Sequence, residues 1–252
     1  MTDTRSPTTV ALFVTCLVDM FRPEAGEATV ALLEKRGARV EFPEEQTCCG
    51  AVAWHAGWRA EAATLARRWI EIFEPYEAIV SPSPACVAVV RQAYPQLLAD
   101  DPAWQRRAEA VGARTWELTE YLAGDDGWGS LGSRYAGVVT YQPSCQALRT
   151  LHSEDQARSL LAEVADAKVV PLPDADSCCG FGGLFSVQMP EISSAMAERK
   201  AKAIEGTGAD IVVTSETGCW MQLHGVLNHR NSDCRAVHLA ELLAGTVETA
   251  AE

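Results

Sequence analysis

Two short stretches with the same core, Cys48-Cys49-Gly50 and Cys178-Cys179-Gly180, decide how the rest of this 252-residue chain is interpreted. They lie 130 residues apart, and each is flanked by one single cysteine upstream and one downstream. Four cysteines therefore recur in the same order at nearly the same spacing, which is typical of an internal repeat. The chain contains nine cysteines, and Cys234 is the one without a counterpart. The pattern predicts two copies of one cysteine module.

The residues between these cysteines predict alternating strands and helices. Short β-branched runs precede the cysteines and favour strands at 11–14, 39–43, 78–81, 137–141, 167–171 and 210–214. Apolar residues at helical spacing favour helices at 28–36, 60–73, 156–164 and 192–204, and each half closes on a short helix, at 117–122 and 238–243. This alternation predicts an α/β fold of two homologous βαβ-type halves with parallel sheets, related by pseudo-twofold symmetry.

The segment between the halves is rich in Gly, Ser and Asp and favours a linker. We expect a first module at 1–124, a linker at 125–134 and a second module at 135–252. The linker contains Gly127, Gly129 and Gly132 in the spacing of a dinucleotide-binding fingerprint. That fingerprint needs a strand before it and a helix after it, and here the order is the reverse. The sequence therefore argues against an NAD-dependent enzyme.

Charge and hydropathy exclude several classes of partner. A net charge of −13 repels nucleic acids and anionic membranes. Residues 1–9 are polar and lack the apolar core of a signal peptide, and no apolar run reaches the length of a transmembrane segment. We therefore expect a cytoplasmic protein with no transmembrane segment and no nucleic-acid partner. In such a reducing compartment, grouped cysteines favour metal or redox chemistry over structural disulfides.

Each module places its cysteines where a parallel sheet binds ligands. The single cysteines follow predicted strands directly, and the Cys-Cys-Gly stretches lie between a strand and a helix. The carboxyl ends of parallel strands share one edge, so each set is expected to converge on a pocket. The first cysteine set is Cys16, Cys48, Cys49 and Cys86, and the second cysteine set is Cys145, Cys178, Cys179 and Cys219.

Three kinds of chemistry fit cysteines in general. Buried free thiols are common for isolated cysteines, but they do not explain a fourfold repeat. Zinc sites usually contain Cys-x-x-Cys, which this chain lacks, because Val89 and Gln222 occupy the third position after Cys86 and Cys219. Four thiolates from separated loops suit an iron–sulfur cluster, and adjacent cysteines can reach neighbouring irons. The interpretation that best fits the spacing is one cluster in each set, and we expect [4Fe-4S] clusters, one or two per chain.

The motifs also resemble a known family. The doubled Cys…Cys-Cys-Gly…Cys pattern is similar to the cysteine-rich CCG domain found in heterodisulfide reductases and in the glycolate oxidase iron–sulfur subunit. The closer resemblance is to the lactate-utilisation protein A family, carried by residues 12–21, 178–186 and 217–219. Heterodisulfide reductase modules end in Cys-x-x-Cys, and Val89 and Gln222 remove that fifth thiolate from both halves. The resemblance therefore implies four ligands in each half.

The resemblance implies an iron–sulfur redox subunit of an L-lactate oxidation complex. Such a subunit takes part in converting L-lactate to pyruvate by electron transfer, together with two other subunits, one of which carries ferredoxin-type clusters. Whether the chain itself acts on lactate is left open. Two alternatives also remain: a metal-free thiol–disulfide redox protein, and a non-catalytic assembly subunit with a structural cluster.

Four other residues are secondary candidates. His55 and His152 follow cysteines closely enough to tune a cluster through hydrogen bonding, although an ordinary capping or partly exposed role is the simpler interpretation. Arg149 and Arg199 are candidates for binding a carboxylate by their charge alone. His238 begins the second closing helix and is expected to be structural.

Overall fold

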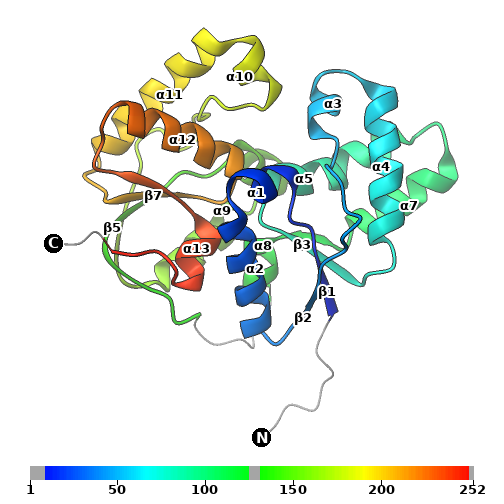
Figure 1. The fold of residues 1–252 in the computed structure, drawn as a ribbon, viewed down its shortest axis with the longest axis horizontal. Coiled ribbons are helices and arrows are strands. Elements are labelled where there is room, and N and C mark those ends of the chain that lie inside the picture. The colour runs from blue at the N-terminus through cyan, green and yellow to red at the C-terminus, as the bar shows by residue number, and fades with distance from the viewer. Residues whose placement is uncertain (1–8, 125–130, 250–252) are drawn as a thin grey trace, which may run out of the picture.

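Two four-stranded parallel sheets, one from each half of the chain, form the framework of the protein (Figure 1). The computed structural model describes residues 9–124 and 131–249. The strand order is β2-β1-β3-β4 in the first sheet and β6-β5-β7-β8 in the second. The strands are β1 (Thr9–Leu12), β2 (Arg39–Glu41), β3 (Ala78–Ser81), β4 (Thr115–Glu117), β5 (Arg134–Tyr141), β6 (Ala165–Val170), β7 (Ile211–Thr214) and β8 (Arg235–His238). The identical order confirms the predicted α/β fold of two homologous βαβ-type halves.

Helices connect the strands in both halves. In the first half these are α1 (Cys16–Phe21), α2 (Pro23–Lys35), α3 (Ala51–His55), α4 (Arg59–Phe73), α5 (Pro84–Ala88), the π-helical turn η1 (Val89–Ala93), α6 (Tyr94–Leu97), α7 (Pro102–Gly112) and α8 (Leu118–Ala123). In the second half they are the π-helical turn η2 (Ala147–Leu151), α9 (Glu154–Ala162), α10 (Leu184–Gln188), α11 (Pro190–Glu205), α12 (Thr217–His229) and α13 (Leu239–Ala244).

The central strands explain why the sheets are parallel and buried. All residues of β3 and β7 are buried, and their sequences, Ala-Ile-Val-Ser and Ile-Val-Val-Thr, are almost entirely apolar or β-branched. Continuous apolar strands of this kind belong inside a sheet covered on both faces. The register pairs Ala11 with Ile79 in the first sheet and Thr140 with Val212 in the second.

The two halves share one hydrophobic core. It contains Leu32 and Leu33 of α2, Leu160 and Leu161 of α9, and Leu242 of α13. Helix α2 packs on α13 of the other half, and α8 packs on α9. Figure 1 shows the first pair, with α2 in blue beside α13 in red. Because α2 corresponds to α9 and α8 to α13, the two contacts are related by the pseudo-twofold symmetry.

Two strands were not predicted from the sequence, and several helices, among them α7 and α12, were not predicted either. Strands β4 and β8 each lie at the edge of a sheet, beside β3 and β7 respectively. Each directly precedes a closing helix, and each contains charged residues that conceal the strand pattern, such as Glu117 and Arg235.

Part of the predicted linker falls outside the described residues. The linker residues concerned are 125–130, which include Gly127 and Gly129. The terminal residues 1–8 and 250–252 also lie outside the described ranges. The division into modules at 1–124 and 135–252 stays a prediction. No helix in the described ranges 9–124 and 131–249 is long and apolar enough to cross a bilayer.

Candidate iron–sulfur site

The single cysteines of each set follow the two central strands of a sheet. Cys16 comes four residues after β1 and Cys86 five residues after β3, while Cys145 and Cys219 repeat these distances after β5 and β7. Strands β1 and β3 are neighbours, and the chain continues from them toward opposite edges of the sheet. This is the topological switch point, where open parallel sheets bind ligands beyond the carboxyl ends of the strands.

The first cysteine set is brought together as two pairs of sulfurs. Cys16 Sγ donates to Cys48 Sγ at 3.7 Å, and Cys49 Sγ donates to Cys86 Sγ at 3.2 Å. Cys49 is buried, whereas the other three are partly exposed. The adjacent cysteines thus face different partners, one following β1 and the other following β3.

The second cysteine set repeats this arrangement. Cys179 Sγ donates to Cys219 Sγ at 3.1 Å, and Cys145 is hydrogen-bonded to Cys178. Cys179 and Cys219 are buried, while Cys145 and Cys178 are partly exposed. All eight sulfurs of the two sets are free thiols in this structure.

The electrostatics of the two sets are also alike. The pKa of Cys48 is lowered well below its usual range because Cys16 and Cys49 hydrogen-bond to its sulfur, and the backbone N–H groups of Gly50 and Ala51 add to the effect. The pKa of Cys178 is lowered for similar reasons, by hydrogen bonds from Cys145, Cys179 and the Gly180 N–H. The hydrogen bonds to these sulfurs raise the pKa of Cys16 and of Cys145 above the usual range. Each site therefore stabilises negative charge on its first vicinal sulfur.

The Cys-Cys-Gly loops need glycine for reasons of packing. Gly50 and Gly180 have φ angles of +79° and +95°, and the N–H of each donates to the sulfur of Cys48 or Cys178 at 3.4 Å. A Cβ at Gly180 would lie 2.6 Å from the carbonyl oxygen of Ser193 on α11. The glycine therefore lets the loop turn tightly enough to present its sulfurs while it lies against the following helix.

The positions of the missing fifth thiolates are filled differently in the two halves. Val89 is buried in the hydrophobic cluster of the first half. Gln222 instead donates from Nε2 to Ser193 Oγ at 3.1 Å, and Ser193 Oγ donates to the carbonyl oxygen of Gly180 at 2.8 Å. Gln222 therefore supports the Cys-Cys-Gly loop through Ser193.

One buried carboxylate connects the two sites. Glu216 precedes α12, which contains Cys219, and its Oε2 accepts from Ser83 Oγ at 3.0 Å and from Ala85 N–H at 2.9 Å. Ser83 and Ala85 lie at the start of α5, which contains Cys86. Desolvation raises the pKa of Glu216. Sequence reasoning missed this contact, although the matched spacing of Ser83 to Cys86 and Glu216 to Cys219 was a usable signal.

The secondary candidates are scattered. Arg149 is exposed, donates to the carbonyl oxygen of Asp176, and lies near enough to lower the pKa of Cys178 slightly. Arg199 is exposed and paired with Asp174 at 2.9 Å. His55 ends α3 at an exposed position, and partial desolvation lowers its pKa. His152 is exposed and caps η2 with a φ of +56°. His238 caps α13 by accepting from Ala240 N–H, as a structural role requires.

The donor set fits a multinuclear group better than a single ion. Among the described residues, no three His, Cys, Asp or Glu side chains converge closely enough to hold one metal ion. Each set nevertheless gathers four thiol sulfurs, with backbone N–H groups directed at one of them. Thiolates spread over a pocket, with N–H donors to sulfur, are the environment that iron–sulfur clusters take in proteins.

Comparison with solved structures supports the fold. The chain matches the structure of a hypothetical protein from Helicobacter pylori with a TM-score of 0.67, at 12% sequence identity. The match covers 97% of this chain and 50% of that chain. At such low identity the match speaks for the architecture alone.

Comparison with known sequences identifies the family. The CCG cysteine-rich domain matches twice, at residues 10–91 and 139–224, and each match contains one complete cysteine set. Lactate utilization protein A from Bacillus pumilus is 42% identical over 93% of this chain and 98% of its own length. The protein of the same name from Bacillus subtilis is 39% identical over the same shares. The chain therefore belongs to the CCG cysteine-rich domain family, in the group that also contains the lactate utilization A proteins.

Proposed function

We propose that this chain is an iron–sulfur redox subunit of an L-lactate oxidation system. The observation that carries the proposal is the assembly of eight cysteines into two matching four-sulfur sets at the switch points of two parallel sheets. The names of its relatives supply the metabolic role, since proteins with about 40% identity along nearly the whole chain are called lactate utilization protein A.

In this proposal each cysteine set holds a cluster of its own. Cys16, Cys48, Cys49 and Cys86 hold one [4Fe-4S] cluster, and Cys145, Cys178, Cys179 and Cys219 hold another. When bound, such a cluster supplies one-electron transfer. The chain's own contribution is to orient the thiolates through the Cys-Cys-Gly turns and to direct N–H groups toward sulfur, which favours the more reduced state.

The proposed reaction is the conversion of L-lactate to pyruvate, which releases two electrons and two protons. We propose that the chain receives these electrons one at a time, as part of an oxidoreductase complex with two other subunits, one carrying ferredoxin-type clusters. Arg199, one candidate for binding the lactate carboxylate, is instead paired with Asp174 at the surface. We propose that lactate binds at a partner subunit or at a surface shared with it, in the cytoplasm.

Anaerobic purification followed by iron and acid-labile sulfide analysis tests the cofactor. We expect both elements in the unsubstituted protein and in the Cys234→Ala variant, because Cys234 is buried in the core of the second half, outside either set. A protein that contains neither element after anaerobic reconstitution would refute the cluster. Electron paramagnetic resonance of the dithionite-reduced protein then identifies the cluster type.

The substrate is tested with the complete system. We expect L-lactate to reduce the clusters of this chain when the two partner subunits are present, with D-lactate and glycolate as comparisons. Reduction by glycolate alone would assign the system to another 2-hydroxy acid.

A thiol–disulfide function is the second candidate, because Cys49 and Cys86, and likewise Cys179 and Cys219, have sulfurs only 3.2 Å and 3.1 Å apart. Modest movement would join either pair in a disulfide. In that case the iron-free protein would lose two hydrogens per disulfide on mild oxidation and would be reduced again by a dithiol. An assembly subunit would instead hold a cluster that L-lactate never reduces.

A further inference from the structure

Lys200 is a buried lysine behind the second cysteine set. It lies on α11 and is 2% exposed. Its Nζ donates to the carbonyl oxygen of Asp174 at 2.6 Å, in the loop that leads to Cys178 and Cys179. Among the residues the structure describes, it forms no ion pair with a carboxylate, because the Asp174 carboxylate pairs with Arg199 at the surface.

The face of α11 that contains Lys200 packs directly on this loop. Ser193 and Ala197 lie on the same buried stripe, and Ser193 Oγ donates to the carbonyl oxygen of Gly180. Ala201, next to Lys200, belongs to the same hydrophobic cluster as Cys179 and Cys219. The ammonium is therefore buried against the loop that leads to Cys178 and Cys179.

A buried ammonium without a counter-charge is unfavourable, because one hydrogen bond to a carbonyl oxygen replaces only part of the hydration that it loses. Desolvation lowers the pKa of Lys200, and negative groups oppose this effect, with Cys179 first and Asp174 next. The thiol groups of the second set are thus the principal buried groups that can supply negative charge to it. An anionic group in this set, such as a cluster held by four thiolates, would complete the pairing.

The first half has no such cation at the equivalent position. A Cβ on Gly50 would lie 3.7 Å from the carbonyl oxygen of Ala62 on α4, as one on Gly180 would approach that of Ser193. Counting seven residues onward from Ala62 and from Ser193 gives Trp69 and Lys200. Trp69 is fully buried and stacks on Phe73. At this position the pseudo-twofold symmetry is therefore broken by one positive charge.

We propose that Lys200 makes the two sites electrically unequal: its fixed positive charge raises the reduction potential of the cluster in the second cysteine set above that of the first. Taking up one electron adds one negative charge and changes no bond, and a nearby cation stabilises that added charge. Electrons released by lactate oxidation then pass from the first site to the second. This inference rests on the proposed function, because it requires that both sets hold clusters.

The test measures the midpoint potential of each site by an anaerobic dithionite titration followed by electron paramagnetic resonance. A Cys48→Ser, Cys49→Ser background isolates the second site, and a Cys178→Ser, Cys179→Ser background isolates the first. In the first of these backgrounds, we expect Lys200→Met to lower the equilibrium constant for one-electron reduction of the second site at least tenfold. This corresponds to a midpoint potential that is lower by about 59 mV or more. Lys200→Arg, which keeps the charge, should stay close to the parent.

Lys202→Met is the matched control, because it removes an exposed lysine charge from the same helix. The proposal is overturned if Lys200→Met shifts the potential no more than Lys202→Met does, or if it shifts the isolated first site equally. Loss of iron from the second site in Lys200→Met and Lys200→Gln, but not in Lys200→Arg, would support the need for a cation. Loss in all three would show a packing role and contradict the proposal. Absence of iron from the parent protein would instead refute the proposed function itself.

Discussion

At the scale of single residues, the glycine of each Cys-Cys-Gly stretch is required by the protein itself. Gly180 has a φ of +95°, which L-residues rarely adopt, and Ser193 of α11 lies against it. Ser193 Oγ also donates to the Gly180 carbonyl at 2.8 Å, which fixes the distance between the loop and the helix. The repeated glycine is therefore part of the structure that positions the sulfurs, whatever they bind.

Gly180→Ala should destabilise the protein and weaken loading of the second site. The new Cβ would lie 2.6 Å from the Ser193 carbonyl oxygen, in a strained backbone conformation, so a cost of about 2 kcal/mol or more is expected. Urea unfolding of the metal-free protein measures this cost.

Gly225→Ala is the control, since Gly225 is exposed within α12 and a Cβ there would meet nothing within 4 Å. It should stabilise by about 0.5–1 kcal/mol, because alanine favours a helix over glycine. Equal stability of the two variants would contradict the packing role of Gly180.

At the scale of elements, buried polar caps start the helices at corresponding places in the two halves. Ser83 and Glu216 begin α5 and α12, and Glu117 and His238 begin α8 and α13. The capping residues differ in chemistry although their positions correspond. Each half can therefore respond differently to pH while keeping the same backbone.

Glu117 should make stability fall as the pH rises through neutrality. Burial raises the pKa of Glu117 to about 7, and its Oε1 has no hydrogen-bond partner among the described residues. The folded state thus prefers the protonated acid, so its contribution is complete below the unfolded pKa of about 4.5 and is lost as the pH passes 7. The contribution amounts to about 3 kcal/mol.

The test compares the free energy of unfolding from about pH 5 to about pH 8 in the parent and in Glu117→Gln. The variant should have a flatter profile, whereas Glu109→Gln, at an exposed position on α7, should match the parent. Parallel profiles for all three proteins would show that Glu117 is ionised in the fold.

The sequence predicted the elements whose pattern is local. The apolar β-branched runs predicted β1, β3, β5 and β7. The placement of the cysteines after these strands predicted that each set of sulfurs meets at one edge of its sheet. Strands β4 and β8 were missed because three or four residues with charged neighbours become strands only beside a buried partner strand. Lys200 and the Glu216–Ser83 contact depend on which helix faces meet in space, which spacing along the chain does not determine.

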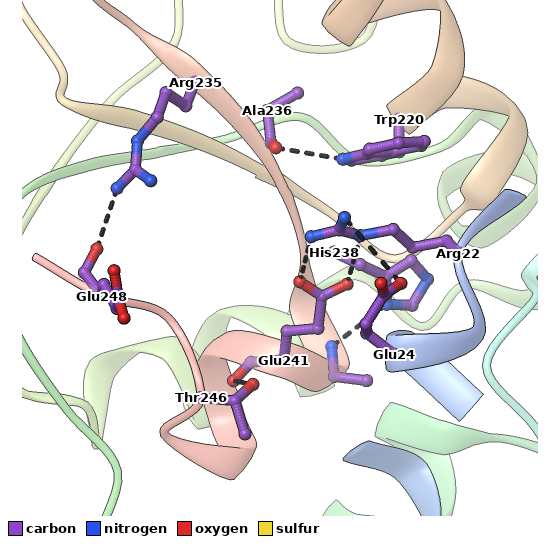
Figure 2. Close-up of polar contacts among 10 residues, drawn as sticks. Arg22, Glu24, Trp220, Arg235, Ala236, His238, Glu241, Thr246 and Glu248 are labelled. Atoms are coloured by element: carbon purple, nitrogen blue, oxygen red, sulfur yellow. Dashed lines mark hydrogen bonds and ion pairs between the residues drawn. The ribbon is translucent and has the colours of Figure 1, made fainter. Parts of the chain in front are cut away.

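At the scale of the whole molecule, a polar junction between Arg22 and Glu241 joins the two halves (Figure 2). Arg22, between α1 and α2, binds both carboxylate oxygens of Glu241 on α13, at 2.7 Å and 2.6 Å. The guanidinium also lies 4.8 Å from the ring centroid of Trp220, the residue after Cys219. Helix α1 begins at Cys16, so this junction connects an element of each site.

A double-mutant cycle of Arg22→Met and Glu241→Gln should give a coupling energy of about 2 kcal/mol. Glu241 is 6% exposed, but Arg22 is 28% exposed, so solvent screens the pair below the value of a fully buried one. Chemical unfolding of the four proteins supplies the four free energies. The same cycle on Arg199 and Asp174, which are 74% and 62% exposed, should give less than about 1 kcal/mol. Similar values for the two cycles would mean that the junction does not hold the halves together.

The most direct test of the central claim is the iron content of four anaerobically reconstituted proteins. These are the parent, the Cys48→Ser, Cys49→Ser variant, the Cys178→Ser, Cys179→Ser variant and the combination of all four substitutions. If each cysteine set holds its own cluster, each double variant retains half of the parent's iron and acid-labile sulfide, and the combined variant retains none. Normal iron in either double variant, or in the combined one, would contradict the assignment of one cluster to each set.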